Sequence, residues 1–227
     1  MCGTAAAALL ADLYSGAGGA GHGYTLAGFH IVGVDNRPQP RYPGCFILAD
    51  ALEVDLAPYD AYHASPPCSD HIRSRNPDSI VHGTGHHLAA ARTRLQATGR
   101  PWLIENVPGA PMRADYRLCG CMYGLGNDRF MLLRERWFET SWHGFRLDTP
   151  CYHDRPAIVN LTGGSWYRTP RPGRHKRYID HATTSAIMGI NWMTRRELGN
   201  AIPPAYTADL GADLLTQLPG HLAGYPG

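Results

Sequence analysis

The sequence predicts a doubly wound α/β fold with a mostly parallel sheet, and three features lead to this prediction. Short apolar runs alternate with helix-like stretches from residue 5 to residue 104. Most of these runs end at a polar residue. In a parallel sheet, ligands bind at the edge formed by the carboxyl ends of the strands. A glycine-rich loop follows the first run, as in folds that bind a nucleotide at that edge.

The first strand is predicted from the apolar run that begins at Ala5, and the glycine loop separates it from a helix-like stretch at residues 24 to 27. Later runs predict strands that end at Asp35, at Asp50, at residue 64 and at residue 104. Residues 86 to 98 and 205 to 218 have helical patterns, and the second of these is expected to close on the core. We therefore expect a core in residues 1–140, a small irregular lobe in 141–186 and a segment, 187–227, that returns to the core.

The charges of this 227-residue chain are unevenly placed, although the net charge is only +2. Residues 1 to 128 hold nine arginines and eleven acidic residues, whereas residues 129 to 196 hold twelve basic residues and five acidic ones. A local basic excess suits a polyanion such as nucleic acid, because each neutralised phosphate releases counterions. An arginine-rich solvated surface explains the same excess equally well.

Nothing in the sequence predicts a membrane span. The apolar runs are far shorter than the ~20 residues that cross a bilayer, and Asp12 interrupts the first one. No basic residue precedes that run, so a secretory signal is not expected, and the six cysteines need not be paired. We expect a monomer in the cytoplasm of a bacterium or a phage-infected host.

The first loop, residues 12 to 19, allows a ligand to approach the backbone closely. Asp35 follows at the end of the next predicted strand, where an acid can hold the two hydroxyls of a ribose. The chain has no Gly-Lys-Ser/Thr phosphate cradle, which favours a nucleoside with a sulfonium tail over a nucleoside triphosphate. Such a loop can also be a plain turn.

Two further motifs suggest covalent chemistry. Cys68 follows a strand end and two prolines, on a stiffened backbone that can present a thiol to a cleft. Glu105 ends another predicted strand and can protonate a ring nitrogen. The alternatives are a buried structural cysteine and an ordinary surface acid.

In content and order these motifs resemble those of the cytosine 5-methyltransferase family, especially its short phage-type members, over nearly the whole chain. The cofactor loop of the family resembles residues 12 to 19, with Tyr14 where an aromatic residue lies against adenine. Its ribose acid and its adenine-contacting acid correspond to Asp35 and Asp50. The remaining motifs correspond to Pro66-Pro67-Cys68, Glu105-Asn106-Val107, Arg134-x-Arg136 and Gly199-Asn200-Ala201.

The resemblance implies a Rossmann-like methyltransferase core in 1–140, a short basic target-recognition lobe in 141–186 and a C-terminal return to the core in 187–227. It implies that S-adenosylmethionine binds to Asp12, Tyr14, Gly16, Gly18, Gly19, Asp35, Asn36, Asp50, Pro67, Asn200 and Ala201.

The implied reaction is methyl transfer to carbon 5 of a flipped cytosine in double-stranded DNA. Cys68 would add to carbon 6, Glu105 would donate a proton, and Arg134 and Arg136 would hold the base. The contacts to DNA are expected from the basic residues Arg73, Arg168, Arg171, Arg174, Lys176 and Arg177.

The sequence also departs from the family pattern. Residues 69 to 72 are Ser-Asp-His-Ile where the family usually has Gln-x-Phe-Ser, and the recognition region is shorter than usual. Three alternatives stay open. They are the same chemistry on RNA, a catalytically silent DNA-binding relative, and a folate-dependent enzyme that modifies cytosine nucleotides.

Cys119-x-Cys121 and Cys151-x-His153 together supply four side chains of the types that bind zinc. One intervening residue is tighter than the usual two to four. We therefore expect structural thiols here in preference to a metal.

Overall fold

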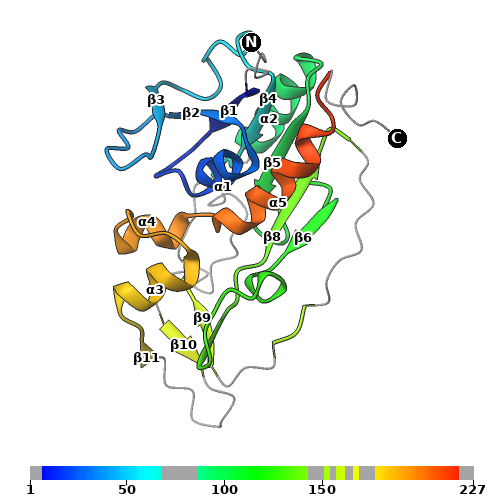
Figure 1. Ribbon diagram of the computed structural model, residues 1–227. Helices are drawn as coiled ribbons and strands as arrows, with labels where there is room; N and C mark the ends of the chain where they lie inside the picture. The colour runs from blue at the N-terminus through cyan, green and yellow to red at the C-terminus, as the bar shows by residue number, and fades with distance from the viewer. Residues whose placement is uncertain are drawn as a thin grey trace, which may run out of the picture.

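The computed structural model describes residues 7–67, 86–142, 151–153, 157–161, 166–168 and 177–219; Asn160, Trp166 and Arg168 are described by their backbone alone. The chain forms two sheets (Figure 1). The main sheet has seven strands in the order β3, β2, β1, β4, β5, β8, β6. These strands are β1 (Leu9–Leu13), β2 (His30–Asp35), β3 (Cys45–Leu48), β4 (Ala61–Ala64), β5 (Trp102–Asn106), β6 (Tyr116–Leu118) and β8 (Arg136–Thr140).

The first five strands of the main sheet are parallel, and β8 runs antiparallel to both β5 and β6. The strand order reverses direction between β1 and β4, which is the switch point at which doubly wound folds bind ligands. The predicted fold class, a doubly wound and mostly parallel α/β sheet, is confirmed.

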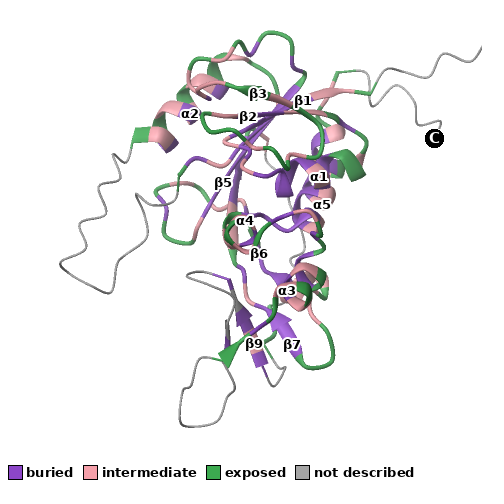
Figure 2. Cartoon of the chain, turned by 90° about the vertical axis from the view of Figure 1, so that its left-hand side faces the viewer, coloured by how far each residue is buried: buried purple, intermediate pink, exposed green. Residues whose placement is uncertain are grey.

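Helices cover both faces of the main sheet, because alternate residues of its central strands point to opposite sides. Leu10, Ala61 and Leu103 pack with residues of α1 (Gly19–Ala27) and α5 (Pro204–Leu215) on one face. Residues next to them in sequence, such as Ala11 and Ile104, pack with α2 (His86–Ala97) on the other. Figure 2 shows the buried strands between these layers.

The second sheet has the order β11, β10, β9, β7. Its strands are β7 (Phe130–Leu132), β9 (Ala157–Asn160), β10 (Trp166–Arg168) and β11 (Arg177–Tyr178). A separate apolar cluster joins this sheet to the helices α3 (His181–Met188) and α4 (Arg195–Asn200). We call this sheet with α3 and α4 the second lobe (Figure 1).

The second lobe is more regular than the irregular lobe expected from the sequence, and its first strand, β7, precedes residue 140. The connection into it passes through the short 3-10 helix η2 (Gly120–Tyr123), which follows β6. The domain limits drawn from the sequence stay a prediction. Within the part of the chain that is described, none of the helices has the length and apolar composition that a membrane span needs.

Helices α1 and α5 approach each other closely at Gly23. A β-carbon added there would lie 2.0 Å from Thr207 Oγ1 and 2.2 Å from the carbonyl oxygen of Pro204. Thr207 Oγ1 also donates a hydrogen bond to the carbonyl oxygen of Ala20 (2.8 Å). The absence of a side chain at residue 23 therefore sets the distance between these two helices.

We predict that Gly23→Ala lowers the free energy of unfolding by about 1–3 kcal/mol, because the added methyl group would overpack the contact with α5. The matched control is Gly44→Ala, whose added carbon would lie 3.6 Å from Tyr42, an ordinary contact. The control should change stability by less than about 0.5 kcal/mol. Urea unfolding measures both, and equal values for the two variants would contradict the prediction.

Candidate active site

The register of the main sheet brings three predicted site residues, and Ser65 beside them, to one edge. Leu13 of β1 pairs with Ala64 of β4, and Ala64 pairs with Ile104 of β5. Leu13 also pairs with Val34 of β2 on its other side. The residues that follow these four are Tyr14, Ser65, Glu105 and Asp35, so they form a row across the carboxyl edge of the sheet.

The glycine loop that follows β1 bends sharply into α1. Gly18 stands before the helix with φ of 84°, a left-handed conformation that favours glycine. A β-carbon on Gly19 would lie 2.5 Å from the carbonyl oxygen of Ile202 and 3.2 Å from the β-carbon of Ala201. The predicted glycine loop and the late Gly-Asn element therefore touch, although about 180 residues separate them in the sequence.

Tyr14 has a strained backbone, since its φ is 58° and it carries a side chain. Its hydroxyl group is buried and has no hydrogen-bond partner among the described residues. A β-carbon on Gly16, two residues later, would have no atom within 4 Å. The Tyr14 ring meets the ring of His87 edge-on, while the space beside the backbone of Gly16 is open.

Carboxylates follow the ends of β2 and β3. Asp35 accepts hydrogen bonds from the backbone N–H of Gly16 (3.0 Å) and of Arg37 (3.0 Å), so it also holds the glycine loop in place. Asp50 accepts a hydrogen bond from the backbone N–H of Leu52 (2.8 Å). Both side chains are partly accessible, whereas the neighbouring Asn36 is exposed.

Asp12 occupies a different environment from the other loop residues. It is buried, and the hydroxyl of Tyr42 donates a hydrogen bond to its Oδ2 (3.3 Å). Burial raises the pKa of this carboxyl to about 8. Hydrogen bonds from Tyr42 and from the backbone of Gly21 in α1 oppose this rise, so Asp12 contacts the helix that follows the loop.

Glu105 and Arg136 form a buried ion pair at the end of β5. Arg136 Nε lies 2.9 Å from Glu105 Oε1, and side-chain exposures are 14% and 8% respectively. Burial raises the pKa of Glu105 above its ordinary value, while the charge of Arg136, a hydrogen bond from Ser65 and the charge of Arg134 oppose this rise. A carboxyl group with a raised pKa is a better proton donor near neutral pH.

A chain of hydrogen-bonded polar groups connects Tyr24 of α1 to Glu105 through His63 and Ser65. The hydroxyl of Tyr24 lies 2.9 Å from Nδ1 of His63, and Nε2 of His63 lies 2.8 Å from the hydroxyl of Ser65. Ser65 in turn bonds to Glu105. Burial lowers the pKa of His63 to about 3, so its ring is neutral at physiological pH and links the two hydroxyl groups.

Asn106 holds the segment that leads to Cys68. Its Nδ2 donates to the carbonyl oxygen of Pro66 (3.1 Å), and its Oδ1 accepts from the backbone N–H of Val107 (2.9 Å). Pro67 is exposed directly after this contact. Cys68 itself lies outside the described residues.

The two arginines of the Arg-x-Arg element have different surroundings. Arg134 is buried and donates to the carbonyl oxygens of Ala201 (2.7 Å) and Gly199 (3.0 Å). Arg134 therefore connects the residues just before β8 to the Gly199-Asn200-Ala201 element. Asn200 of this element is exposed. Arg136 forms the ion pair with Glu105, and the charge of Arg134 also acts on this carboxyl group.

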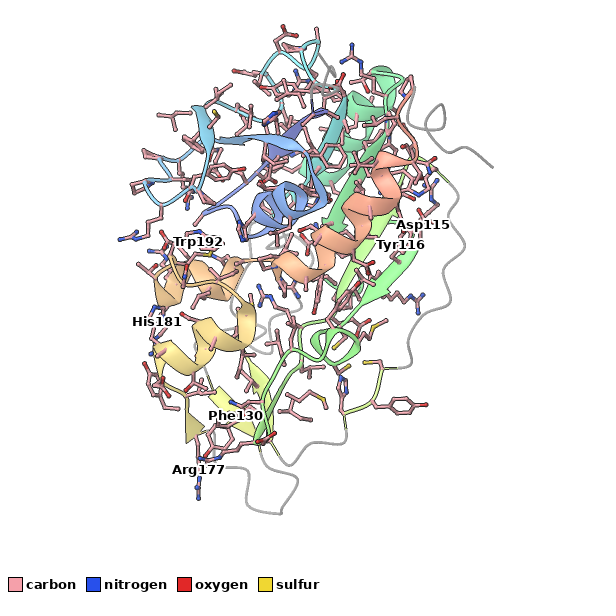
Figure 3. The ribbon with its side chains drawn as sticks, viewed as in Figure 1. Asp115, Tyr116, Phe130, Arg177, His181 and Trp192 are labelled. Atoms are coloured by element: carbon pink, nitrogen blue, oxygen red, sulfur yellow. The ribbon has the colours of Figure 1, made fainter. Side chains whose placement is uncertain are left out.

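The predicted nucleic-acid contacts are described only in part. Arg73, Arg171, Arg174 and Lys176 lie outside the described residues. Arg168 belongs to β10. Arg177 is exposed on the edge strand β11, and Figure 3 shows it at the far end of the second lobe.

Two further residues of this region were not anticipated from the sequence. Trp192 Nε1 donates to the carbonyl oxygen of Ala17 (2.9 Å), and its ring meets that of His22 edge-on, so the segment between α3 and α4 packs on the glycine loop (Figure 3). No motif marks Trp192 in the sequence. The sequence does mark His63, because it is a polar residue inside the otherwise apolar strand β4.

Comparisons with solved structures identify the fold. The chain aligns with S. pombe Dnmt2 methyltransferase (TM-score 0.61, 15% identity), covering 92% of this chain and 98% of that one. It aligns with the Entamoeba histolytica methyltransferase EhMeth with a TM-score of 0.60 and 12% identity, covering 93% of this chain and 99% of that one. It also aligns with a proposed DNA modification methyltransferase encoded within an E. coli prophage, with a TM-score of 0.57 and 13% identity, covering 93% of this chain and 99% of that one. The chain thus has the Rossmann-like fold of these methyltransferases. No family model and no curated protein matches its sequence.

We predict that Arg136→Met lowers the free energy of unfolding by about 3–5 kcal/mol at pH 8, because it leaves the Glu105 carboxylate buried without its cation. Without the cation the pKa of Glu105 rises further, so stability is retained at low pH and lost as the pH increases. The loss should therefore be smaller at pH 5. Urea unfolding at both pH values measures it.

Two controls accompany this measurement. Adding Glu105→Gln to the variant should recover much of the loss, since it removes the unpaired charge. Arg41→Met, which removes a pair in which Arg41 is 46% exposed, should cost less than about 1 kcal/mol. A loss from Arg136→Met that is the same at both pH values would contradict the assigned pairing.

Proposed function

We propose that this chain is an S-adenosylmethionine-dependent methyltransferase that methylates carbon 5 of cytosine in double-stranded DNA, with Cys68 as a covalent nucleophile. The observation that carries the proposal is the contact between Asn106 and Pro66, next to the buried pair of Glu105 and Arg136. This contact fixes the backbone two residues before Cys68 beside a carboxyl group that is suited to proton donation. A nucleophile and an acid are two of the groups that this reaction requires.

Carbon 5 of cytosine becomes nucleophilic only after a group has added to carbon 6. The Cys68 thiolate would form that bond, while Glu105 donates a proton to the ring nitrogen as negative charge develops. Arg136 holds the Glu105 carboxyl in place and, of the two arginines in its motif, is the better placed to contact the base. Carbon 5 would then form a bond to the methyl group as the bond between that methyl and sulfur breaks, and the proton on the ring nitrogen would return to Glu105. A base would remove the proton from carbon 5, which re-forms the double bond between carbons 5 and 6 and expels the Cys68 thiolate.

The residues at the end of β1 fit an adenosine-containing cofactor. Tyr14 offers an aromatic ring and a hydroxyl without a partner among the described residues, and the space beside the backbone of Gly16 is open. Asp35 and Asp50 offer carboxylate oxygens for hydroxyl and amino groups. When bound there, S-adenosylmethionine supplies the methyl group as an electrophile on its sulfonium sulfur.

Double-stranded DNA is the proposed substrate because of the basic segment from 129 to 196. Its described part includes the exposed residues Arg129, Arg177 and Arg196 on or beside the second lobe. This lobe packs on the glycine loop through Ala17 and Trp192, so its positive charge belongs to the lobe that adjoins the candidate site. The base must leave the helical stack to react, at a cost of a few kcal/mol.

Trapping with 5-fluorocytosine tests the mechanism. Fluorine replaces the proton that must leave carbon 5, so addition proceeds and elimination does not. We expect a DNA adduct that forms with S-adenosylmethionine, survives denaturing electrophoresis and maps to the peptide from Ser65 to Arg73.

Three variants make this experiment specific. Cys68→Ser should abolish the adduct, whereas Cys45→Ser, a change at an exposed cysteine of β3, should leave it intact. Glu105→Gln should slow trapping by roughly 100-fold or more while cofactor binding persists. Retained trapping in Cys68→Ser would refute the proposed nucleophile, and an adduct on RNA with none on DNA would refute the proposed substrate.

A further inference from the structure

Four potential metal ligands meet at the junction of the main sheet and the second lobe. They are Cys119, Cys121, Cys151 and His153, and their ligand atoms all lie within 4.8 Å of one another. Cys119 and Cys121 flank the start of η2, directly after β6. Cys151 and His153 come from the segment that leads toward β9. Thirty residues of sequence separate the two pairs, so the fold itself assembles the cluster.

The distances within this cluster are close to those around a tetrahedral metal ion. Cys121 Sγ lies 3.1 Å from Cys151 Sγ, and His153 Nε2 lies 3.2 Å from Cys151 Sγ and 3.5 Å from Cys119 Sγ. Zinc bonds of ~2.3 Å to sulfur and ~2.0 Å to nitrogen place neighbouring tetrahedral ligands roughly 3.5–3.8 Å apart. Small adjustments of the side chains would therefore complete the site.

The sequence favours an interpretation of these cysteines as buried structural thiols. That interpretation does not explain this arrangement. Cys119 is buried, but Cys121 is only partly buried and Cys151 is exposed. The Sγ atoms of Cys121 and Cys151 are also too far apart for a disulfide, whose sulfur atoms are about 2.05 Å apart. Three thiols and an imidazole that converge on one point remain to be explained.

We propose that Cys119, Cys121, Cys151 and His153 bind one Zn²⁺ ion. Three thiolates and an imidazole form a ligand set that selects zinc and fills all four positions of its tetrahedron. No position is left for water or a substrate, so the ion is structural. This inference does not depend on the proposed methyltransferase activity.

The ion would join η2 to the chain segment that leads into β9. Cys119 lies against β7 of the second lobe, where its Sγ approaches the carbonyl oxygen of Leu132 (4.0 Å). Cys151 and His153 lie on the chain segment entering β9, the neighbour of β7 in the second sheet. Zinc would thus fix that segment against η2, and its binding free energy would contribute to folding of the second lobe.

Metal analysis of the purified full chain tests this proposal. We expect about one zinc ion per chain by inductively coupled plasma mass spectrometry. When Co²⁺ replaces zinc in the protein without mutations, we expect the visible absorption of a tetrahedral site with thiolate-to-cobalt charge transfer. Removal of the metal with a chelator should lower the melting temperature, and added Zn²⁺ should restore it.

Variants locate the ion. His153→Ala and Cys121→Ser should each lose most of the bound zinc, whereas His153→Cys, which keeps four ligands, should retain it. Cys45→Ser is the matched control, because this free cysteine lies in β3 of the main sheet, and it should retain the metal. Circular dichroism confirms that each variant is folded.

Three outcomes would overturn the proposal. They are a folded, metal-free protein that takes up no Co²⁺, a disulfide between Cys121 and Cys151 in protein purified without oxygen, and zinc that persists in folded His153→Ala and Cys121→Ser. Loss of zinc in Cys45→Ser equal to the loss in His153→Ala would also place the ion elsewhere. The metal content and the trapping of 5-fluorocytosine are independent readouts, so either proposal can fail alone.

Discussion

A carboxylate buried at the end of a central strand is costly unless a cation pairs with it, and much of this structure follows from that constraint. Glu105 meets the constraint through Arg136, which is available only because β8 lies antiparallel beside β5. Ser65, which follows β4, adds a hydrogen bond to Glu105, and His63 and Tyr24 continue this hydrogen-bonded chain from Ser65. The same strand order that builds the main sheet therefore also places the cation that pairs with Glu105.

The second constraint is that the end of the chain must return to its beginning. Gly19 has no side chain where it meets Ile202, and Arg134 binds the carbonyl oxygens of Gly199 and Ala201. Three segments far apart in sequence are thereby held at one edge of the sheet. The second lobe is attached at the same place, through Trp192 on the glycine loop, so the basic surface and the candidate site are positioned by one set of contacts.

The main sheet could be predicted from the sequence because its parallel strands are short apolar runs that end at polar residues such as Asp35. The strands beyond β5 could not, because they have as few as two or three residues and lie among prolines and arginines. Within the site, strand ends pointed to Glu105, but no local pattern distinguishes the buried Arg134 from Arg136, since their difference comes from long-range partners. Spacing along the chain likewise does not show that Cys119, Cys121, Cys151 and His153 converge, because the fold brings them together.

The most direct test of the central claim is to follow a labelled methyl group from S-adenosylmethionine into nucleic acid. The protein should be incubated with DNA, RNA and free cytidine nucleotides in parallel, and the products digested to nucleosides and identified by mass spectrometry. The account predicts labelled 5-methylcytosine in double-stranded DNA, and none when Cys68 is replaced by alanine. Label at another atom, or 5-methylcytosine formed equally well by Cys68→Ala, would contradict it.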